Sequence, residues 1–516
     1  YILQGDFKIS MIKWLMLFSQ RRFFNMDKNK KIGLFSLIMM IFSSIFGFAN
    51  MPVAFLQMGY ASIIWYIFAA IFFFLPVAMM LAEYGATFKE EEGGIYSWLT
   101  HTLGEKWAFI GTFIWLSSWI IWLLSISSKV YIPFSAMLFG KDLTQTWAFG
   151  PFNATQVIGL LGIFWMLLVT FCASRGVSVI SKVSSIGGTF VSAMVVVFLV
   201  ATGIAFVASH GQMQEALTVH SLVKAPNPAF QSPVATMSFV VYAIFAYAGL
   251  ESLGGMIDSI DQPEKTFPKG LLISSLLIAA AYSLMILLWG VSTNWQRDLS
   301  GDSVNLGNIT YVMMQHLGVY LGQTLGLKAR TSALIGNIFI RFVGLGMFLA
   351  YVGSFFILIY SPIKSFILGS KHLWPEKMTK LNKHGIPEFA MWMQALLVCI
   401  LIFLISFGGG QAKTFYTILT DMSNVSTSFP YLFLVGAFPI FKKKVFDQPF
   451  EVYKKHGWTQ VITLISFLII LFGIIFTCVQ PFLDGDYVTG FWTIIGPIFF
   501  GGLAWLIYRQ AEKKTK

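Results

Sequence analysis

Long apolar stretches, separated by short polar or charged breaks, fill most of this chain of 516 residues. A helix that crosses a membrane needs about 20 predominantly apolar residues, because its backbone must satisfy its hydrogen bonds without water. Stretches of this kind lie near residues 32–56, 60–83, 107–133, 154–173, 183–208, 234–257, 270–292, 333–359, 388–406, 414–440, 458–480 and 490–508. The pattern predicts an all-α integral membrane protein with about 12 transmembrane helices.

The scarcity of charge excludes the soluble classes of protein. Asp, Glu, Lys and Arg make up 11% of the residues, against about 25% in a soluble globular domain. The three cysteines have no paired spacing, and the seven histidines do not form a metal-binding pattern such as H-E-x-x-H. The nucleotide-binding pattern G-x-x-x-x-G-K-[ST] does not occur. We therefore expect no enzyme, no cofactor and no metal.

The basic residues are distributed unevenly between the predicted loops. If the N-terminus is cytoplasmic, 27 of the 35 Lys and Arg residues lie in segments on the inner side and six lie in outer loops. The last two, Lys129 and Arg341, lie inside predicted spans. The positive-inside rule then places both termini in the cytoplasm. Because the basic balance is explained by topology, nucleic acid is not an expected partner.

The first 31 residues precede the first apolar stretch and form a separate N-terminal segment. The apolar run in residues 11–18 is too short to span a membrane. Met26, followed by Asp27 and three lysines up to Lys31, resembles a natural start just before the first span. We expect residues 1–25 to be an upstream extension or a helix that lies on the membrane surface.

Two predicted spans are interrupted by small and polar residues at mid-membrane depth. The first contains FSSIFGFANMP at residues 42–52, and the sixth contains YAIFAYAGLESLGG at residues 242–255. Interrupted segments at corresponding positions of two halves indicate a transporter built from inverted repeats. We therefore predict discontinuous helices 1 and 6, five-span repeats at 32–208 and 233–441, two added spans at 458–508, and a cytoplasmic tail at 509–516. The alternative is that Gly and Ser merely allow close helix packing.

An unwound helix exposes backbone groups that can bind a zwitterion. Amides at the start of a half-helix favour a carboxylate, and exposed carbonyls favour an ammonium group. Aromatic side chains near the breaks can contact the ammonium group. The predicted substrate-binding residues at the breaks are Ser43, Ser44, Ile45, Phe46, Gly47, Phe245, Ala246, Tyr247, Gly249 and Leu250.

Several short motifs resemble those of the amino acid–polyamine–organocation superfamily of permeases. Residues 92–98 (EGGIYSW) are similar to its P-x-G-G-x-Y-x-W element, and residues 249–251 (GLE) to its G-[FV]-E element. Residues 261–268 (DQPEKTFP) and 373–387 resemble two of its loops, and 429–432 (FPYL) the end of its tenth span. Within the superfamily, the chain is most similar to bacterial inner-membrane permeases of the glutamate/γ-aminobutyrate antiporter group.

The resemblance implies a twelve-helix, leucine-transporter-like fold in a bacterial cytoplasmic membrane. It also implies a secondary active transporter that exchanges amino acids or takes them up with protons. The resemblance adds three predicted substrate-binding residues, which lie at depths where relatives place gating or substrate-facing residues: Trp122, Phe356 and Asp421. The chain departs from the family in two places: only Gly47 is left of a Gly-Ser-Gly element, and no lysine lies near Val191, where some relatives place one. Glu251 matches a family glutamate that couples a proton to transport. The alternative is a structural acid that is hydrogen-bonded to the first span.

Three further ionisable residues lie within predicted spans and need partners or water. Asp421 is predicted to pair with a cationic ligand or with Lys129 or Arg341, or else to form a hydrogen bond at a helix interface. Lys129 is predicted to extend towards the outer surface, and Arg341 to pair with an acid and close the outer vestibule. Glu83 is expected to form a solvated pair with inner-loop lysines.

These charges do not determine the charge of the substrate's side chain. If Lys129 or Arg341 faces the site, a substrate with an anionic side chain such as glutamate is favoured; if Asp421 faces it, a cationic one is. The partners we expect are a small-molecule amino acid and membrane lipid, and the protein is expected to be a monomer or a homodimer. An amino-acid-responsive channel or membrane sensor is the alternative to a transporter.

Overall fold

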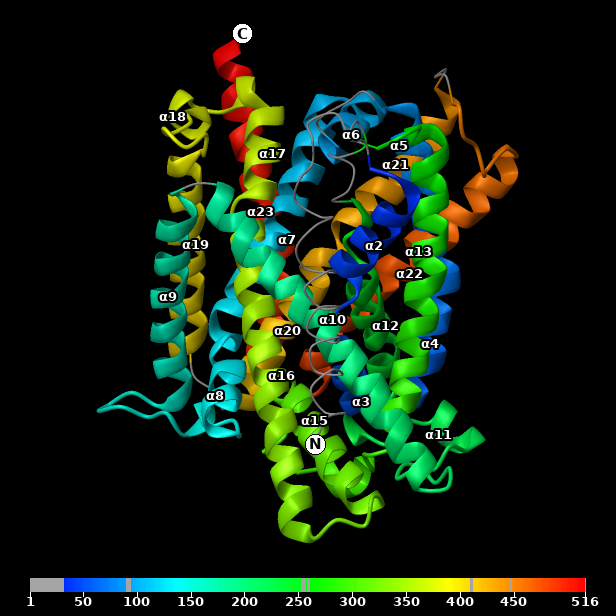
Figure 1. Ribbon diagram of the computed structural model, residues 1–516. Coiled ribbons are helices and arrows are strands. Elements are labelled where there is room, and N and C mark those ends of the chain that lie inside the picture. Colours follow the sequence, from blue (N-terminus) through cyan, green and yellow to red (C-terminus); the bar gives the residue numbers. More distant parts are fainter. Residues whose placement is uncertain are drawn as a thin grey trace, which may run out of the picture.

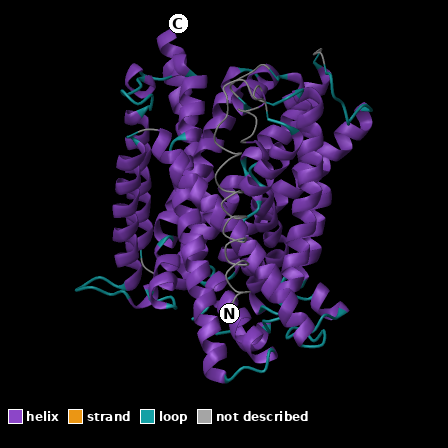
Figure 2. Cartoon of the chain, in the orientation of Figure 1, coloured by secondary structure: helices purple, strands orange, loops and turns teal. Residues whose placement is uncertain are grey.

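The computed structural model describes residues 32–89, 94–175, 177–251, 257, 260–301, 303–408, 412–444 and 448–515. These residues form a bundle in which most long helices run side by side (Figure 1). Within them the ordered secondary structure is helical (Figure 2), apart from two isolated β-bridges that join Ile32 to Ile260 and Phe149 to Phe152. The prediction of an all-α protein is confirmed for the described part of the chain.

Ten helical segments among the described residues are long and apolar enough to cross a membrane. Their elements are α4 (Ala61–Ala69) with η1 (Ala70–Phe74) and α5 (Leu75–Thr87), α7 (Glu105–Lys129) with α8 (Tyr131–Phe139), α9 (Ala154–Ala173), α10 (Val177–Ala208), α13 (Pro263–Trp289), α16 (Ala329–Leu358) with α17 (Ser361–Gly369), α19 (Glu388–Phe407), α20 (Ala412–Ser428) with α21 (Pro430–Lys443), α22 (His456–Leu483) and α23 (Tyr487–Thr515). Each overlaps a predicted apolar stretch. The chain is thus a multi-pass membrane protein.

The other two predicted spans are those that the sequence shows as interrupted. The first is divided into α2 (Leu34–Ile45) and α3 (Asn50–Met58), with four non-helical residues between them. The sixth begins with α12 (Pro233–Tyr247), after which Ala248 is extended and Gly249 has φ 122°. Residues 252–256 lie outside the described residues. A total of twelve spans and the inverted repeat stay predictions.

Shorter helices cover the two ends of the bundle. They are α6 (Ile95–Leu103), η2 (Thr144–Thr146), α11 (Val219–Val223), η3 (Pro228–Phe230), α14 (Trp295–Asp298), α15 (Ile309–Thr324), η5 (Lys371–Leu373) and α18 (Glu376–Thr379). In Figure 1, α11 and α15 lie at the lower end and α6 and α18 at the upper end. These are called the α15 end and the α18 end below.

Local sequence signals begin several of the long helices. Asn153 and Gln156 form a capping box at the start of α9, and Ser232 accepts a hydrogen bond from the amide of Ala235 at the start of α12. The exposed face of α9 is apolar and includes Leu160, Phe164 and Phe171. Such a continuous apolar surface is unfavourable in water but favourable against lipid.

Glycines bring the backbones of neighbouring helices close together. A Cβ atom added at Gly187 in α10 would lie 2.6 Å from the carbonyl oxygen of Leu349 in α16, whereas one at Gly188 would meet nothing within 4 Å. We expect Gly187→Val to lower the free energy of unfolding by about 1–3 kcal/mol, because the backbones must move apart. Gly188→Val is the control and should not destabilise. Thermal unfolding of the purified proteins checks this; equal effects would contradict it.

Glu83 at the α18 end is not solvated, which corrects the expectation from the sequence. Its side chain is fully buried and accepts hydrogen bonds from the amides of Val452 and Tyr453, at 2.6 and 2.9 Å. Lys442 in α21 lies 2.9 Å from the carboxylate and also contacts Glu451 at 2.8 Å. A buried ion pair therefore fastens α5 and α21 to the segment before α22.

Candidate functional site

A cavity of about 280 Å³ lies beside the break in the first predicted span. Its lining includes the whole stretch from Ile45 to Asn50, together with residues of α7, α10, α12, α16 and α20. From α7 come Trp119, Trp122, Ser125, Ile126 and Lys129; from α12, Tyr242 and Phe245; from α20, Thr420, Ser423, Asn424 and Thr427. This volume is close to the lower end of the range for small-molecule sites, about 300–1,000 Å³. We call it the central cavity.

Tyr282 of α13 holds the two interrupted segments together. Its hydroxyl accepts hydrogen bonds from the amide of Gly47 at 2.9 Å and from the side chain of Asn50 at 3.1 Å. It lies 3.1 Å from the carbonyl oxygen of Ile45 and 3.0 Å from that of Ala246, to one of which it donates. The backbone groups that the break exposes are thus partly satisfied by one buried side chain.

The start of α3 lies at this cavity, although the amide of Asn50 already donates to the carbonyl oxygen of Gly47 at 3.0 Å and Pro52 has no amide hydrogen. Its N-cap residue is Ala49, which provides no side-chain cap, and both Ala49 and Asn50 line the cavity. The first amides of a helix have no partner inside the helix, and they favour negative charge. This end of α3 is therefore suited to a carboxylate.

Lys129 is the only charged residue in the described lining of the central cavity. Its Nζ atom donates to Oγ1 of Thr420 at 2.8 Å, and the Thr420 hydroxyl donates in turn to the carbonyl oxygen of Tyr416 at 2.8 Å. The side chain is held inside the protein and does not extend to the outer surface, in contrast to the expectation from the sequence. The cavity thus offers one ammonium group and no carboxylate.

The predicted substrate-binding residues divide into two groups. Ile45, Phe46, Gly47, Trp122 and Phe245 line the central cavity. The others that can be placed do not line it: Ala246, Tyr247, Gly249, Leu250, Phe356 and Asp421. Ser43 and Ser44 fall in α2, but their side chains lie outside the described part of the structure.

Tyr247 shows why a residue beside the break does not line the central cavity. It is buried among α4, η1 and α13, where its ring stacks on Phe74 with centroids 4.4 Å apart. Its hydroxyl donates to the carbonyl oxygen of Tyr66 at 3.2 Å. Tyr247 therefore packs between helices, and Phe245, two residues earlier, contributes to the cavity.

Glu251 is a buried acid held by three donors. Its carboxylate accepts from the indole of Trp115 at 3.3 Å, from the amide of Gly249 at 3.0 Å and from the hydroxyl of Tyr431. No Lys, Arg or His of the described residues lies within ion-pair distance of it. Its partners come from α7 and α21, whereas the structural alternative placed them on the first span.

Asp421 and Arg341 both lie away from the central cavity. Asp421 follows Thr420 in α20 and lines a second cavity, described below. Arg341 is exposed and forms no ion pair with an acid of the described residues: its guanidinium donates to the carbonyl oxygens of Met137 and Leu138, at 3.0 and 2.6 Å, and to Asn337 at 2.6 Å. It caps the C-terminal end of α8. The expectation that it pairs with an acid is therefore wrong in this structure.

The sequence reasoning missed Tyr282, Thr420 and Asn424. Tyr282 lies in an apolar span and carries no local signal of its role. Thr420 and Asn424 are separated by four residues and so lie on one helix face, which a search for polar residues at helical spacing around Asp421 can find.

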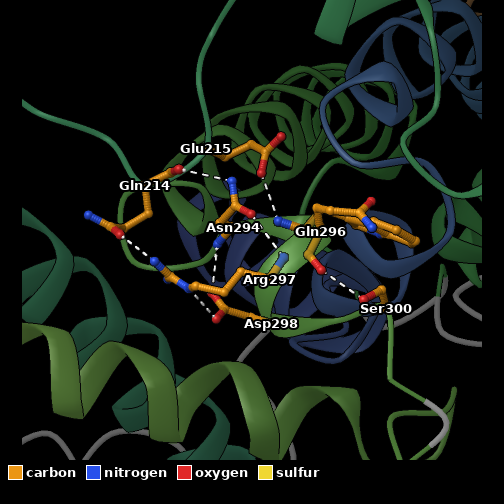
Figure 3. Close-up of polar contacts among 8 residues, drawn as sticks. Gln214, Glu215, Asn294, Gln296, Arg297, Asp298 and Ser300 are labelled. Atoms are coloured by element: carbon orange, nitrogen blue, oxygen red, sulfur yellow. Dashed lines mark hydrogen bonds and ion pairs between the residues drawn. The ribbon is translucent and has the colours of Figure 1, made fainter.

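A network of hydrogen bonds between polar side chains connects the loops at the α15 end (Figure 3). Arg297 of α14 contacts Asp298 at 2.7 Å and Gln214 at 3.0 Å, and the amide of Trp295 donates to Glu215 at 2.7 Å. The Trp295 indole donates to the carbonyl oxygen of Leu56, at 2.8 Å, near the end of α3. This network links the loop after α10 to the C-terminal end of α3.

Asp298 gives the network a pH dependence. Burial acts to raise the pKa of Asp298, but hydrogen bonds from Arg297 and Asn294 hold it below its ordinary value. A carboxyl with a lowered pKa stabilises the folded state at neutral pH, and this contribution is lost as the pH falls through that pKa. We expect Asp298→Asn to cost about 1–3 kcal/mol at pH 7, with a smaller difference from wild type towards pH 3. Thermal unfolding across this range tests it; a constant difference would contradict it.

The helices and the cavity at an interrupted span define a class: a multi-pass membrane protein with an internal site for a small molecule. The profile of the family described as amino acid permease matches residues 32–500, and the chain belongs to this family.

Known relatives cover nearly the whole chain. It is 49% identical over 484 residues to the inner membrane transporter YjeM of Escherichia coli (strain K12), covering 93% of this chain and 96% of that protein. It is 26% identical over 460 residues to a glutamate/gamma-aminobutyrate antiporter of Lactococcus lactis subsp. lactis (strain IL1403), covering 88% and 84%. It is 22% identical over 459 residues to the aspartate/glutamate permease AcaP of Lactococcus lactis subsp. cremoris (strain MG1363), covering 85% and 87%. The predicted family and the prediction of a transporter, not an enzyme, are confirmed.

Proposed function

We propose that this protein is a secondary active transporter of amino acids that carry a carboxylate on the side chain, such as glutamate, or a carboxylate at a position other than α, such as γ-aminobutyrate. Glutamate and γ-aminobutyrate are the preferred pair. The observation that carries the proposal is the charge of the central cavity, where Lys129 is the only charged residue of the described lining. Asp421 interacts electrostatically with this ammonium group but does not line the cavity; a substrate carboxylate would give the ammonium group a partner inside the cavity. The names of two relatives, a glutamate/gamma-aminobutyrate antiporter and an aspartate/glutamate permease, point to the same chemistry.

A second carboxylate-binding position is available at the start of α3. This helix end has no side-chain cap and lies against the same cavity as Lys129, so the helix dipole would favour a carboxylate there, although the amide of Asn50 is itself bonded to Gly47. Glutamate has two carboxylates and can use both positions, whereas γ-aminobutyrate has one. The aromatic residues Trp122 and Phe245 of the lining are suited to contact the substrate's ammonium group.

The proposed mechanism is alternating access about the interrupted helices, by exchange or with proton coupling. In this proposal the protein lies in a bacterial cytoplasmic membrane with both termini inside, so that the α15 end faces outwards. This orientation is supported by the bias of Lys and Arg towards the opposite side. Two five-span repeats would place the central cavity near the middle of the membrane, where transporters of this construction bind their substrates.

Proton coupling is assigned to Glu251. The carboxylate is buried, it is without a cation among the described residues, and its donors lie on α7 and α21, helices that contact each other. Protonation would weaken its bonds to Trp115 and Tyr431 and so loosen this junction. We expect uptake by the wild type to vary with pH, and uptake by Glu251→Gln to change by less than about twofold between about pH 5 and pH 8, because an amide does not titrate there.

The measurement for Glu251 is the initial rate of uptake into proteoliposomes at several external pH values. Glu376→Gln, which changes an exposed acid of α18, is the control and should keep the wild-type profile. If Glu251→Gln is active and follows the wild-type profile, Glu251 is not the coupling group.

Competition tests the proposed substrate. Uptake of labelled glutamate into proteoliposomes should be inhibited by unlabelled glutamate and γ-aminobutyrate, and not by arginine or lysine at the same concentration. A panel in which the cationic amino acids compete best and glutamate does not would refute the assignment of the central cavity to a carboxylate.

A further inference from the structure

A second cavity, of about 510 Å³, lies at the α15 end beside the central one. The ends of α3 and α12, helix α14, the outer part of α20, and the junction between α22 and α23 all contribute to its lining. Tyr242, Leu306 and Asn424 line both cavities and form the wall between them. Asp484 is exposed, so this cavity reaches the surface of the protein.

The charge of the second cavity is opposite to that of the central one. Asp421, Asp484 and Asp486 line it, and its described lining contains no Lys, Arg or His. Asp484 accepts from Gln480 at 2.8 and 2.9 Å, and Asp486 accepts from the amide and hydroxyl of Thr489. No described residue donates a hydrogen bond to Asp421. Three carboxylates thus face one space whose described lining holds no cation, while Asp421 also interacts electrostatically with Lys129 of the neighbouring central cavity.

Unpartnered acceptors lie in the same lining. Gln57 is 6% exposed and Asn424 is 3% exposed, and neither Oε1 of Gln57 nor Oδ1 of Asn424 has a hydrogen-bond partner in the described structure. Oε1 of the half-buried Gln480 is a third acceptor, against one unpartnered donor, Nδ2 of Asn305. Buried polar atoms are normally satisfied. The excess of acceptors calls for a ligand that donates hydrogen bonds.

The size and spacing of these groups favour an organic cation over a metal ion. The volume is that of a small-molecule site. No three His, Cys, Asp or Glu residues of the described chain lie close enough together to hold a metal ion. A primary ammonium group combines positive charge with three donors and no acceptor, as the lysine side chain does.

We propose that the second cavity binds a primary amine, at a site separate from the central cavity. Asp421 and Asp486 provide the charge, and Gln57 and Asn424 accept hydrogen bonds from the amine. This site does not depend on the substrate of the central cavity. It acts in the outer half of the protein and selects for ligands by their ammonium group, whereas the central cavity selects by a carboxylate.

The test is equilibrium binding of labelled 1,4-diaminobutane to the purified full-length protein, with 1,4-butanediol as a neutral competitor of the same length. We expect saturable binding that the diol does not displace. The double variant Asp421→Asn/Asp486→Asn should bind at least about tenfold more weakly, because two of the carboxylates that face the cavity are removed. Glu376→Gln on α18 is the control and should bind as the wild type does.

Two further variants keep the result interpretable. Gln57→Met removes an unpartnered buried group, so it should fold at least as well as the wild type and still bind the diamine more weakly. Lys129→Met should keep diamine binding even where amino-acid uptake is lost, which separates this site from the proposed function. The proposal is overturned if the diamine does not bind saturably or if the diol displaces it. It is also overturned if binding is lost in Lys129→Met and kept in both Asp421→Asn/Asp486→Asn and Gln57→Met.

Discussion

Replacing Lys129 with methionine is expected to reduce uptake of glutamate strongly at concentrations that saturate the wild type. The ammonium group lies in a cavity with no other charge among its described lining, so nothing replaces it as the partner of a carboxylate. Removing one partner of a buried, hydrogen-bonded charge pair costs about 2–5 kcal/mol. Since each 1.4 kcal/mol is tenfold in affinity, the KM for glutamate should rise about thirtyfold or more.

The measurement is the concentration dependence of glutamate uptake by proteoliposomes that hold equal amounts of each protein. Lys141→Met, which changes an exposed lysine after α8, is the matched control and should leave KM unchanged. Thr420→Val removes the hydroxyl that holds Lys129 and should have a smaller effect in the same direction. A Lys129→Met protein with the wild-type KM would show that the substrate carboxylate binds elsewhere.

The second large effect is a loss of stability, which we expect for Glu83→Gln. The amide removes the buried counter-charge of Lys442, whose side chain is 7% exposed, and leaves it with the 37% exposed Glu451 as its acidic partner. Breaking a buried ion pair by removing one partner costs about 3–5 kcal/mol. The free energy of unfolding, measured by denaturant titration of the purified protein in detergent, should fall by that amount.

An exposed ion pair in the same protein provides the comparison. Lys89 and Glu264 lie 3.8 Å apart, with side chains 41% and 29% exposed. Glu264→Gln should therefore change the unfolding free energy by less than about 1 kcal/mol. Equal effects of Glu83→Gln and Glu264→Gln would contradict the account of the α18 end as held by a buried pair.

The sequence predicts the helices well because lipid imposes a simple rule. A chain that must bury every backbone hydrogen bond in lipid shows its helices as apolar runs, and ten of the predicted runs are long helices in the described residues. The break in the first span is also visible, because Gly47 and Pro52 weaken the helix there. The positions of Phe46 and Gly47 in the lining follow from that break.

What the sequence does not show is the rotation of a helix and the contacts between distant segments. Thr420 and Asp421 are adjacent, yet one residue turns a helix by about 100°, so they face different cavities. The direction in which these side chains point decides whether the central cavity presents a positive or a negative charge. The sequence does not determine this direction. The burial of Glu83 depends on Lys442 and Val452, more than 350 residues away.

Counterflow tests the central claim most directly. Proteoliposomes containing the purified protein are loaded with unlabelled glutamate or with buffer, and entry of labelled glutamate is followed over time at several external concentrations. A transporter that alternates its access predicts saturable entry, a transient overshoot with internal glutamate, and loss of both in Lys129→Met. Entry that rises linearly with concentration and ignores the internal amino acid would indicate a channel, and binding without entry would indicate a sensor.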